Sequence, residues 1–304
     1  MAKDISTLVD DIYAVVEGNG GWDETINEHF IKKLGVTLSD RLNPKGAYKP
    51  TLRVSNLGSP CEAKLWYSIN EPNEGSTLAS STRLLFLYGD ILEDLLISLC
   101  EAAGHEVTGL QDTLKVAGLT GHRDCVIDGV TVDIKSASNY NFDKFKFGTL
   151  RGDDTYGYIS QLSSYVYAGA EDPLVRDKSN GAFLVINKTS GEVVLDTYDL
   201  TEEIKNKEEE VNQKRAMVKA PKPPKKAFSP TPDGYYVGKK ADGVFKANGN
   251  MKLNMKCNFC DFKKKCFPNI KGYDKGRYGT LYLTEVSSPP KNKYRKVHTE
   301  VEIL

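Results

Sequence analysis

The sequence predicts an α/β protein, in which a central mixed sheet is flanked by helices. A helical region precedes this core and a cysteine-cluster clasp follows it. An Asp128-Gly129 pair between two apolar, β-branched runs is the strongest short signal for a hairpin. Residues 80–103 have apolar side chains at helical spacing and are followed by Gly104. Residues 182–198 form two further apolar runs that turn through Ser190-Gly191.

Four regions are expected along the chain. Residues 1–53 have apolar side chains at helical spacing and form an N-terminal helical region. Residues 54–220 form the α/β core. Because Pro221-Lys-Pro-Pro-Lys-Lys breaks the preceding helix, residues 221–249 are expected to be a basic Pro/Gly linker. Residues 250–304 hold the cysteine module and the C-terminal tail.

A two-residue turn at Asp128-Gly129 determines the register of the first hairpin. In this register Asp124 faces Asp133, and His122 faces Lys135. Side chains alternate between the two faces of a strand pair. One face is therefore entirely apolar and consists of Cys125, Ile127, Val130, Val132 and Ile134.

The two facing carboxylates indicate a cation site. Like charges directly opposite each other destabilise a strand pair unless something offsets their repulsion. A divalent cation would do so, and oxygen ligands suit Mg²⁺ or Mn²⁺. Lys135 would lie beside this cation as a partner for a phosphate. The alternative is a polar-faced hairpin whose acids are simply solvated.

Two helices flank the predicted hairpin in sequence. The helix over 80–103 presents one apolar stripe, and periodicity places Glu93 off that stripe, in solvent. A helix over 158–170 carries Gln161 and Tyr165 on the same face, because they are four residues apart. The aromatic, Lys- and Gly-rich segment 142–157 is expected to form a loop or short helix at the edge of the site. The stripe consists of Leu84, Tyr88, Leu92, Leu95 and Leu99.

Composition limits the classes of protein. With 39% hydrophobic and 27% charged residues, the 304-residue chain is typical of a globular protein. It has no membrane-span or signal-peptide pattern, so we expect a cytoplasmic protein without a membrane partner. The formal net charge is zero, yet residues 214–266 hold fourteen Lys and Arg against three acids, a balance of 14 − 3 = +11. Such a basic segment is suited to binding a polyanion.

Three cysteines near the C-terminus have the spacing of metal ligands. Cys257, Cys260 and Cys266 follow a C-x2-C-x5-C pattern, in which two thiolates reach one metal centre. Cys125 points into the hairpin core and Cys100 lies beside the helix stripe. Cys61 is therefore the best candidate for a fourth ligand. Spacing alone leaves an iron–sulfur cluster and zinc equally open.

These motifs together resemble the RecB-like branch of the PD-(D/E)XK nuclease superfamily, and in particular its iron–sulfur-bearing members. These include the nuclease domains of RecB-type and AddB-type proteins, the CRISPR-associated four-cysteine nucleases and phage exonucleases. The resemblance covers residues 54–268, with Arg123 standing at the Pro position of the superfamily's name. The matching motifs are Gly89-x3-Glu93, Gly121-x2-Asp124, Asp133-x-Lys135, Gln161-x3-Tyr165 and the split set of four cysteines.

The resemblance implies a restriction-endonuclease-like core and a role for each motif. Asp124, Asp133, Glu93 and the backbone carbonyl of Ile134 would bind Mg²⁺ or Mn²⁺. Lys135 would position the attacking water and stabilise charge on the phosphate. Gln161 and Tyr165 would orient the scissile strand, and His122 would support the metal ligands or contact a phosphate. Cys61, Cys257, Cys260 and Cys266 would hold a 4Fe-4S cluster in preference to zinc.

The activity implied is metal-dependent exonucleolytic cleavage of DNA in recombination, repair or replication. For a phage-encoded protein this would take place in the host cytoplasm. The expected partners are DNA, as single strands or duplex ends, and a helicase, annealing protein or single-strand-binding protein. The Lys-rich segment would line the DNA path. Two alternatives stand beside this activity: a catalytically idle iron–sulfur DNA-binding subunit, and a structure-specific endonuclease of the same fold.

Overall fold

The computed structural model describes residues 3–43, 50–75, 79–238, 243–275, 279–290 and 295–297. The chain divides into two compact units. Unit 1 comprises Met1–Pro60 and Leu78–Ala220, and unit 2 comprises Cys61–Thr77 and Pro221–Leu304. Unit 2 therefore joins a short early segment to the C-terminal part of the chain. Within the described residues, no helix is long and apolar enough to cross a membrane.

Unit 1 contains the α/β core, as predicted. Its five-stranded sheet has the order β1-β4-β5-β6-β7. Strands β5 and β6 are parallel, whereas the other neighbouring pairs are antiparallel, so the sheet is mixed. The strands are β1 (Val107–Thr108), β4 (Cys125–Ile127), β5 (Val130–Ala137), β6 (Asn180–Asn187) and β7 (Val193–Asp199).

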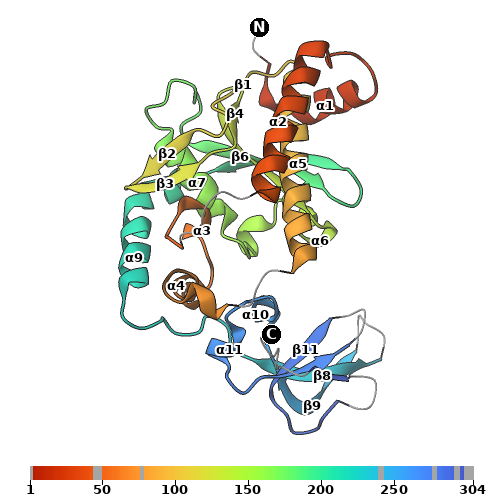
Figure 1. Ribbon diagram of the computed structural model, residues 1–304, viewed down its shortest axis with the longest axis vertical. Helices are drawn as coiled ribbons and strands as arrows, with labels where there is room; N and C mark the ends of the chain where they lie inside the picture. Colours follow the sequence, from red (N-terminus) through yellow and green to blue (C-terminus); the bar gives the residue numbers. More distant parts are fainter. Residues whose placement is uncertain are drawn as a thin grey trace. The chain divides into compact units, whose positions relative to one another are not determined.

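Helices cover both faces of this sheet (Figure 1). On one face, side chains of α1 and α5 pack against Ile134 and Leu184. On the other face, side chains of α6 and α7 pack against Phe183 and Val185. Since side chains alternate along β5, Asp133 and Lys135 lie on the α6 and α7 side. The helices of unit 1 are α1 (Leu8–Val16), α2 (Glu24–Leu42), α3 (Val54–Leu57), α5 (Ser80–Ala102), α6 (Asn139–Lys146), α7 (Tyr158–Ala168), α8 (Thr201–Lys205) and α9 (Lys207–Lys219), with short 3-10 turns at Ile5–Thr7 and Leu150–Gly152.

The predicted hairpin is confirmed in its turn and in its register from Cys125 to Val132. Ile127 pairs with Val130 and Cys125 with Val132. Asp128 and Gly129 both have positive φ, 49° and 79°, as a type I′ turn requires. The predicted apolar face is also confirmed, because Cys125 and its partners lie in the core against α5.

The expected pairing of His122 with Lys135 is wrong. His122 ends β3 (Leu119–His122), which pairs with β2 (Thr113–Val116) in a separate two-stranded sheet, with Thr113 opposite His122. The chain changes sheets at Arg123, whose fully buried guanidinium forms ion pairs with Asp112 and Asp172, both at 2.7 Å. A hairpin register cannot be extended past such a change of sheet.

The predicted apolar stripe of the long helix is correct only in its second half. Leu84 and Tyr88 of α5 are 66% and 41% exposed, whereas Leu92 is buried. Leu96 and Ile97 contribute to the core instead. Helical spacing determines which residues share a face, but not which part of the helix is covered by the sheet.

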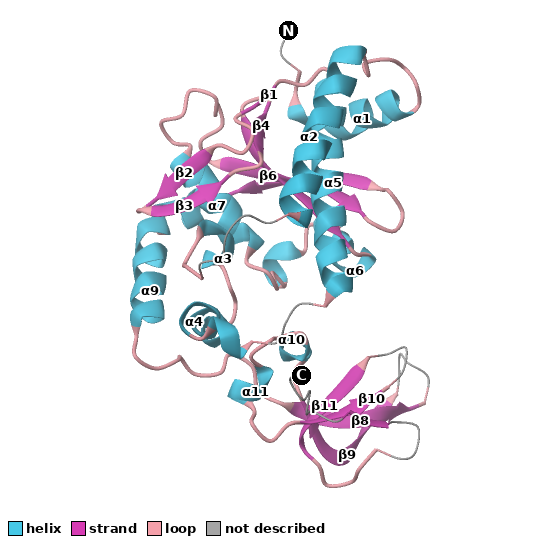
Figure 2. Cartoon of the chain, viewed as in Figure 1, coloured by secondary structure: helices cyan, strands magenta, loops and turns pink. Residues whose placement is uncertain are grey.

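Unit 2 contains a second sheet, in the order β12-β10-β11-β9-β8 (Figure 2). Residues 231–237 and 244–249, predicted to belong to the basic linker, lie in strands β8 and β9 of this sheet. Pro232 is compatible with β8 because an edge strand leaves some of its N–H groups unpaired. The elements are α4 (Glu62–Asn70), a 3-10 turn (Pro72–Glu74), β8 (Thr231–Val237), β9 (Val244–Lys252), α10 (Met255–Asn258), α11 (Lys263–Cys266), β10 (Lys271–Asp274), β11 (Thr280–Glu285) and β12 (Arg295–Val297).

Candidate functional site

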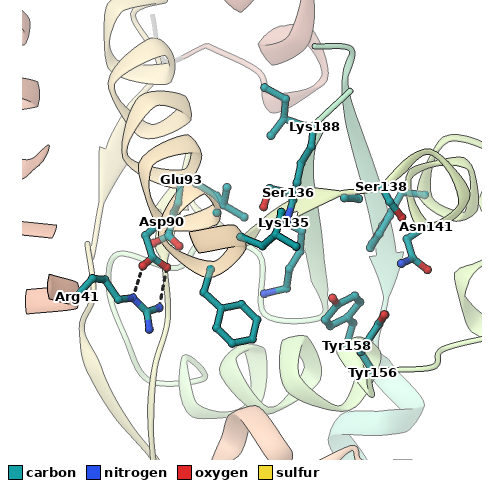
Figure 3. Close-up of a pocket in the computed structure, with 17 residues that line it drawn as sticks. Arg41, Asp90, Glu93, Lys135, Ser136, Ser138, Asn141, Tyr156, Tyr158 and Lys188 are labelled. Carbon is teal, nitrogen blue, oxygen red and sulfur yellow. Dashed lines mark hydrogen bonds and ion pairs between the residues drawn. The ribbon is translucent and has the colours of Figure 1, made fainter. Parts of the chain in front are cut away.

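A pocket of about 460 Å³ opens where β5 and β6 end in unit 1. Ligands of α/β sheets commonly bind outside the carboxyl ends of parallel strands. The pocket is lined from β5 by Lys135, from α5 by Asp90 and Glu93, and from the α6–α7 side by Tyr156 and Tyr158 (Figure 3).

Asp124 and Asp133 lie next to each other at this end of the sheet. Asp124 directly precedes β4, and its Oδ2 accepts a hydrogen bond of 2.7 Å from the Ile134 N–H. Asp133 is completely buried and forms an ion pair with Lys135. Apart from this ion pair, no described residue donates a hydrogen bond to either oxygen of Asp133. Its lone pairs thus remain available to a cation.

Three carboxylates at the site are poorly solvated and repel one another. Burial raises the pKa of Asp124 to about 7, and the charge of Asp133 contributes to that rise. Burial also raises the pKa of Glu93 to about 8, with the charge of Asp124 as the next cause. The pKa of Asp133 is raised by burial, against the effect of Lys135. Burial disfavours the charged form of Lys135, but Asp133 and Asp124 raise its pKa above the ordinary value.

Glu93 lies at the site and not in bulk solvent, contrary to the periodicity argument. Its Oε1 accepts a hydrogen bond of 2.9 Å from the side-chain amide of Gln111. The backbone N–H of Gln111 donates to the Asp124 carbonyl at 3.1 Å. Gln111 thus links two of the acids, and it does so from a left-handed backbone conformation with φ of 52°. No sequence motif indicated this residue.

Gln161 and Tyr165 project from the same face of α7, as predicted. The Gln161 amide donates to the Tyr165 hydroxyl at 3.4 Å. Both residues line a neighbouring hollow of about 640 Å³ together with Gly121 and His122. His122 therefore lies with the Gln161–Tyr165 pair, where its Nδ1 is 3.2 Å from the Thr113 hydroxyl.

Several further residues of the Lys135 pocket were not identified from the sequence. Arg41 of α2 forms a bidentate pair with Asp90, which is drawn with dashed lines in Figure 3. Asp90 is three residues before Glu93, a spacing that places both on one side of a helix and that offered a usable signal. Tyr158 lies 5.3 Å from the Lys135 ammonium, measured from the ring centroid.

The donor set at these acids fits a hard divalent cation. Carboxylate oxygens are the ligands that Mg²⁺ and Mn²⁺ prefer, and Asp124, Asp133 and Glu93 are near enough for their charges to act on one another. A bound cation would also reverse the rise in their pKa values. Among the residues that the structure describes, no three or more His, Cys, Asp or Glu side chains are arranged so that they could hold a metal ion.

The raised pKa values predict that stability without metal falls with increasing pH. Asp124 and Glu93 titrate near pH 7 and 8 when folded, above their ordinary values of 3.8 and 4.5. The folded state therefore retains protons that the unfolded state loses, and stability present below about pH 4 is lost as pH rises through 7–8. In EDTA, we expect Tm to fall by about 4–8 °C between pH 5 and 8.5.

Asp124→Asn should flatten this dependence of Tm on pH, because its amide oxygen can still accept from Ile134 but carries no charge. Asp143→Asn provides the matched control, since Asp143 is exposed on α6. A wild-type melt that is constant over this pH range would contradict the electrostatics described for the site.

The four predicted cysteine ligands all belong to unit 2. Cys61 caps α4, and short helices α10 and α11 carry Cys257 and Cys266. All four thiols are partly buried and none forms a disulfide. Burial raises the pKa of Cys257 to about 11, and the neighbouring charges of Cys260, Cys61 and Cys266 add to the rise. The chemistry of four thiols in one unit fits an iron–sulfur cluster or zinc, although the described side chains are not arranged as a metal site.

Contacts between the early and late segments of unit 2 surround these thiols. Tyr67 of α4 stacks on Phe262 with ring centroids 5.7 Å apart. Lys265 forms an ion pair of 2.8 Å with Glu71. The Lys226 ammonium lies 4.4 Å from the centre of the Phe267 ring. Basic side chains of the predicted Lys-rich segment are thus held next to the cysteines.

Comparison with known proteins gives little further information. The sequence matches no protein-family model, and no curated protein shows significant similarity to it. A solved structure, described as "Crystal structure of SSO0001", has 15% sequence identity and a TM-score of 0.41, and the match covers 79% of this chain and 96% of that one. A likeness at this level supports no conclusion about function.

Proposed function

We propose that the protein is a metal-dependent deoxyribonuclease of the PD-(D/E)XK type, with a restriction-endonuclease-like core and exonucleolytic activity on DNA. One observation carries the proposal: the fully buried Asp133 forms an ion pair with Lys135, and the charges of Asp124 and Glu93 act on this pair next to the pocket at the carboxyl ends of β5 and β6. A buried structural ion pair would need one acid for one lysine. Three acids with raised pKa values around one lysine are instead suited to a cation and a phosphate.

Each side chain has a defined part in this chemistry. Asp124, Asp133, Glu93 and the Ile134 carbonyl would hold Mg²⁺ or Mn²⁺, which activates water and offsets charge on the phosphate when bound. Lys135 orients the water and stabilises the charge that develops on phosphate oxygens. Gln111 fixes Glu93, since it donates a hydrogen bond to that carboxylate. Gln161 and Tyr165 orient the strand from the neighbouring hollow.

The cysteine module completes the proposal. Cys61, Cys257, Cys260 and Cys266 would hold a 4Fe-4S cluster, with zinc as the alternative. The basic side chains of residues 214–266 would contact DNA phosphates, so that affinity falls with increasing salt. Such an activity would serve recombination, repair or replication, in the cytoplasm or, for a phage-encoded protein, in the host cytoplasm. A helicase, annealing protein or single-strand-binding protein would supply the DNA substrate.

Digestion of end-labelled linear DNA tests this proposal. With Mg²⁺ or Mn²⁺, we expect progressive shortening from an end, and no cleavage in EDTA. Closed circular single-stranded DNA should remain intact, because it has no end. Cleavage of the circle would instead identify an endonuclease of the same chemistry. Binding without any cleavage would favour the idle DNA-binding subunit.

A further inference from the structure

The rim of the Lys135 pocket contains an exposed aromatic ring that the proposed chemistry does not use. Tyr156 is 53% exposed and lines the pocket. Its ring stacks on Tyr158, with centroids 5.2 Å apart and an angle of 27° between the planes. Tyr158 in turn lies against the Lys135 ammonium. Tyr158 thus covers one face of Tyr156, as Figure 3 shows, and the exposed half of Tyr156 is available to a ligand.

The loop that carries Tyr156 is held firmly in place. The carboxylate of Asp154 accepts hydrogen bonds from the backbone N–H groups of Tyr156, Gly157, Tyr158 and Ile159, at 2.8–3.3 Å. Gly157 has φ of 79°, and a Cβ there would lie 2.1 Å from the Gly58 carbonyl oxygen. The exposed ring is therefore presented by an ordered turn, at little further entropic cost on binding.

A cation at the same pocket indicates that the ligand is anionic. Lys188 follows β6, lines the pocket and is half-buried. Within the described part of the chain, no carboxylate pairs with its ammonium. Burial lowers the pKa of Lys188, and an anion would compensate for that burial. In Figure 3, Lys188 lies at the top of the pocket and Tyr156 at the bottom.

We propose that the outer face of Tyr156 is a stacking subsite for a nucleobase close to the scissile phosphate, while Lys188 contacts a phosphate of the same strand. This inference rests on the proposed nuclease function and specifies how its substrate is held. An exposed aromatic ring beside cations matches the way proteins hold unpaired nucleotides, by stacking each base and neutralising its phosphate. The base on Tyr156 must leave its own stack, so a single-stranded segment lies at this position.

Oligonucleotide binding by the full chain tests the subsite. Single-stranded DNA with one abasic position, moved stepwise from the labelled end, is titrated by fluorescence anisotropy in Ca²⁺. We expect Tyr156→Ala to raise Kd about 5- to 150-fold, the range for loss of one stacked base. For wild type, one abasic position should cost a similar factor. In Tyr156→Ala, the same abasic position should raise Kd no further.

Matched variants separate stacking from other effects. Tyr156→Phe retains the ring and should bind as wild type, whereas Tyr156→Leu should bind as Tyr156→Ala. The non-additive effect of Tyr156→Ala and the abasic position is the coupling that identifies stacking. Tyr235→Ala removes a 60% exposed tyrosine of unit 2 and should leave the effect of the abasic position as in wild type. Lys188→Met should weaken binding at every abasic position and reduce its salt dependence.

The outcomes distinguish this inference from the proposed function. If the protein cleaves DNA with Mg²⁺ but the effects of Tyr156→Ala and of every abasic position simply add, the subsite is wrong and the nuclease stands. If coupling is found without cleavage, the subsite stands and the nuclease fails. If the oligonucleotide is neither bound nor cleaved, both proposals are wrong.

Discussion

Asp133→Asn is expected to reduce metal-dependent cleavage of DNA by about 10³-fold or more, the scale associated with losing the electrostatic stabilisation of a developing charge. Asp133 is the fully buried acid at the centre of the site and is the ion-pair partner of Lys135. Asparagine keeps the shape of the side chain but removes the charge that would hold the cation. Initial rates on end-labelled DNA over a series of Mg²⁺ concentrations measure the loss.

Two controls make this result specific to the site. Asp143→Asn changes the charge of an exposed residue on the neighbouring helix and should retain full activity. The melting temperature of Asp133→Asn in EDTA should not fall by more than a few degrees, so that loss of activity is not loss of the fold. Wild-type cleavage rates in Asp133→Asn would refute the assignment of the acids.

Cys257→Ser is expected to leave unit 2 unfolded while unit 1 keeps its structure. Metal binding appears as folding free energy, on the order of 10 kcal/mol for a structural zinc site. Cys257 and its three partners all lie in unit 2, which joins residues 61–77 to residues 221–304. Limited proteolysis, followed by mass spectrometry, should show new cleavage confined to these ranges.

The metal content of cysteine variants provides the control for this experiment. Cys100 is fully buried in the core of unit 1 and is not one of the four proposed ligands. Cys100→Ala should lower the stability of unit 1 by about 1–2 kcal/mol through lost packing, yet retain all metal. Iron, sulfide and zinc analysis of the wild type decides between the two kinds of centre. Full metal content in Cys257→Ser would exclude that thiol as a ligand.

Local sequence pattern was sufficient to predict the hairpin and the helix α7 at the site. Asp-Gly chemistry determined the turn of the hairpin, and the two-residue period determined which side chains share its apolar face. Helical spacing correctly brought Gln161 and Tyr165 to one face. These features depend on residues a few positions apart, whose geometry is set by backbone dihedrals alone.

Features that depend on distant contacts required the tertiary structure. The loop that brings Gln111 to Glu93 has no pattern, and its left-handed residue is tolerated only because the surrounding contacts hold it. Part of the predicted linker forms two strands because β8 pairs with β9 and β9 pairs with β11, which supplies hydrogen bonds that a Pro- and Gly-containing segment does not specify by itself. His122 does not belong to the hairpin for a similar reason, because it pairs with Thr113 of β2.

The sequence by itself therefore determined the hairpin and the cysteine spacing, because each is encoded within one short segment. Only the tertiary structure decided how exposed each acid is, which side chains surround Lys135 and which unit contains Cys61. The pKa values of Asp124 and Glu93 illustrate the difference. The sequence alone shows that both side chains are carboxylic acids. The burial that raises the pKa of each depends on segments that are distant in the sequence.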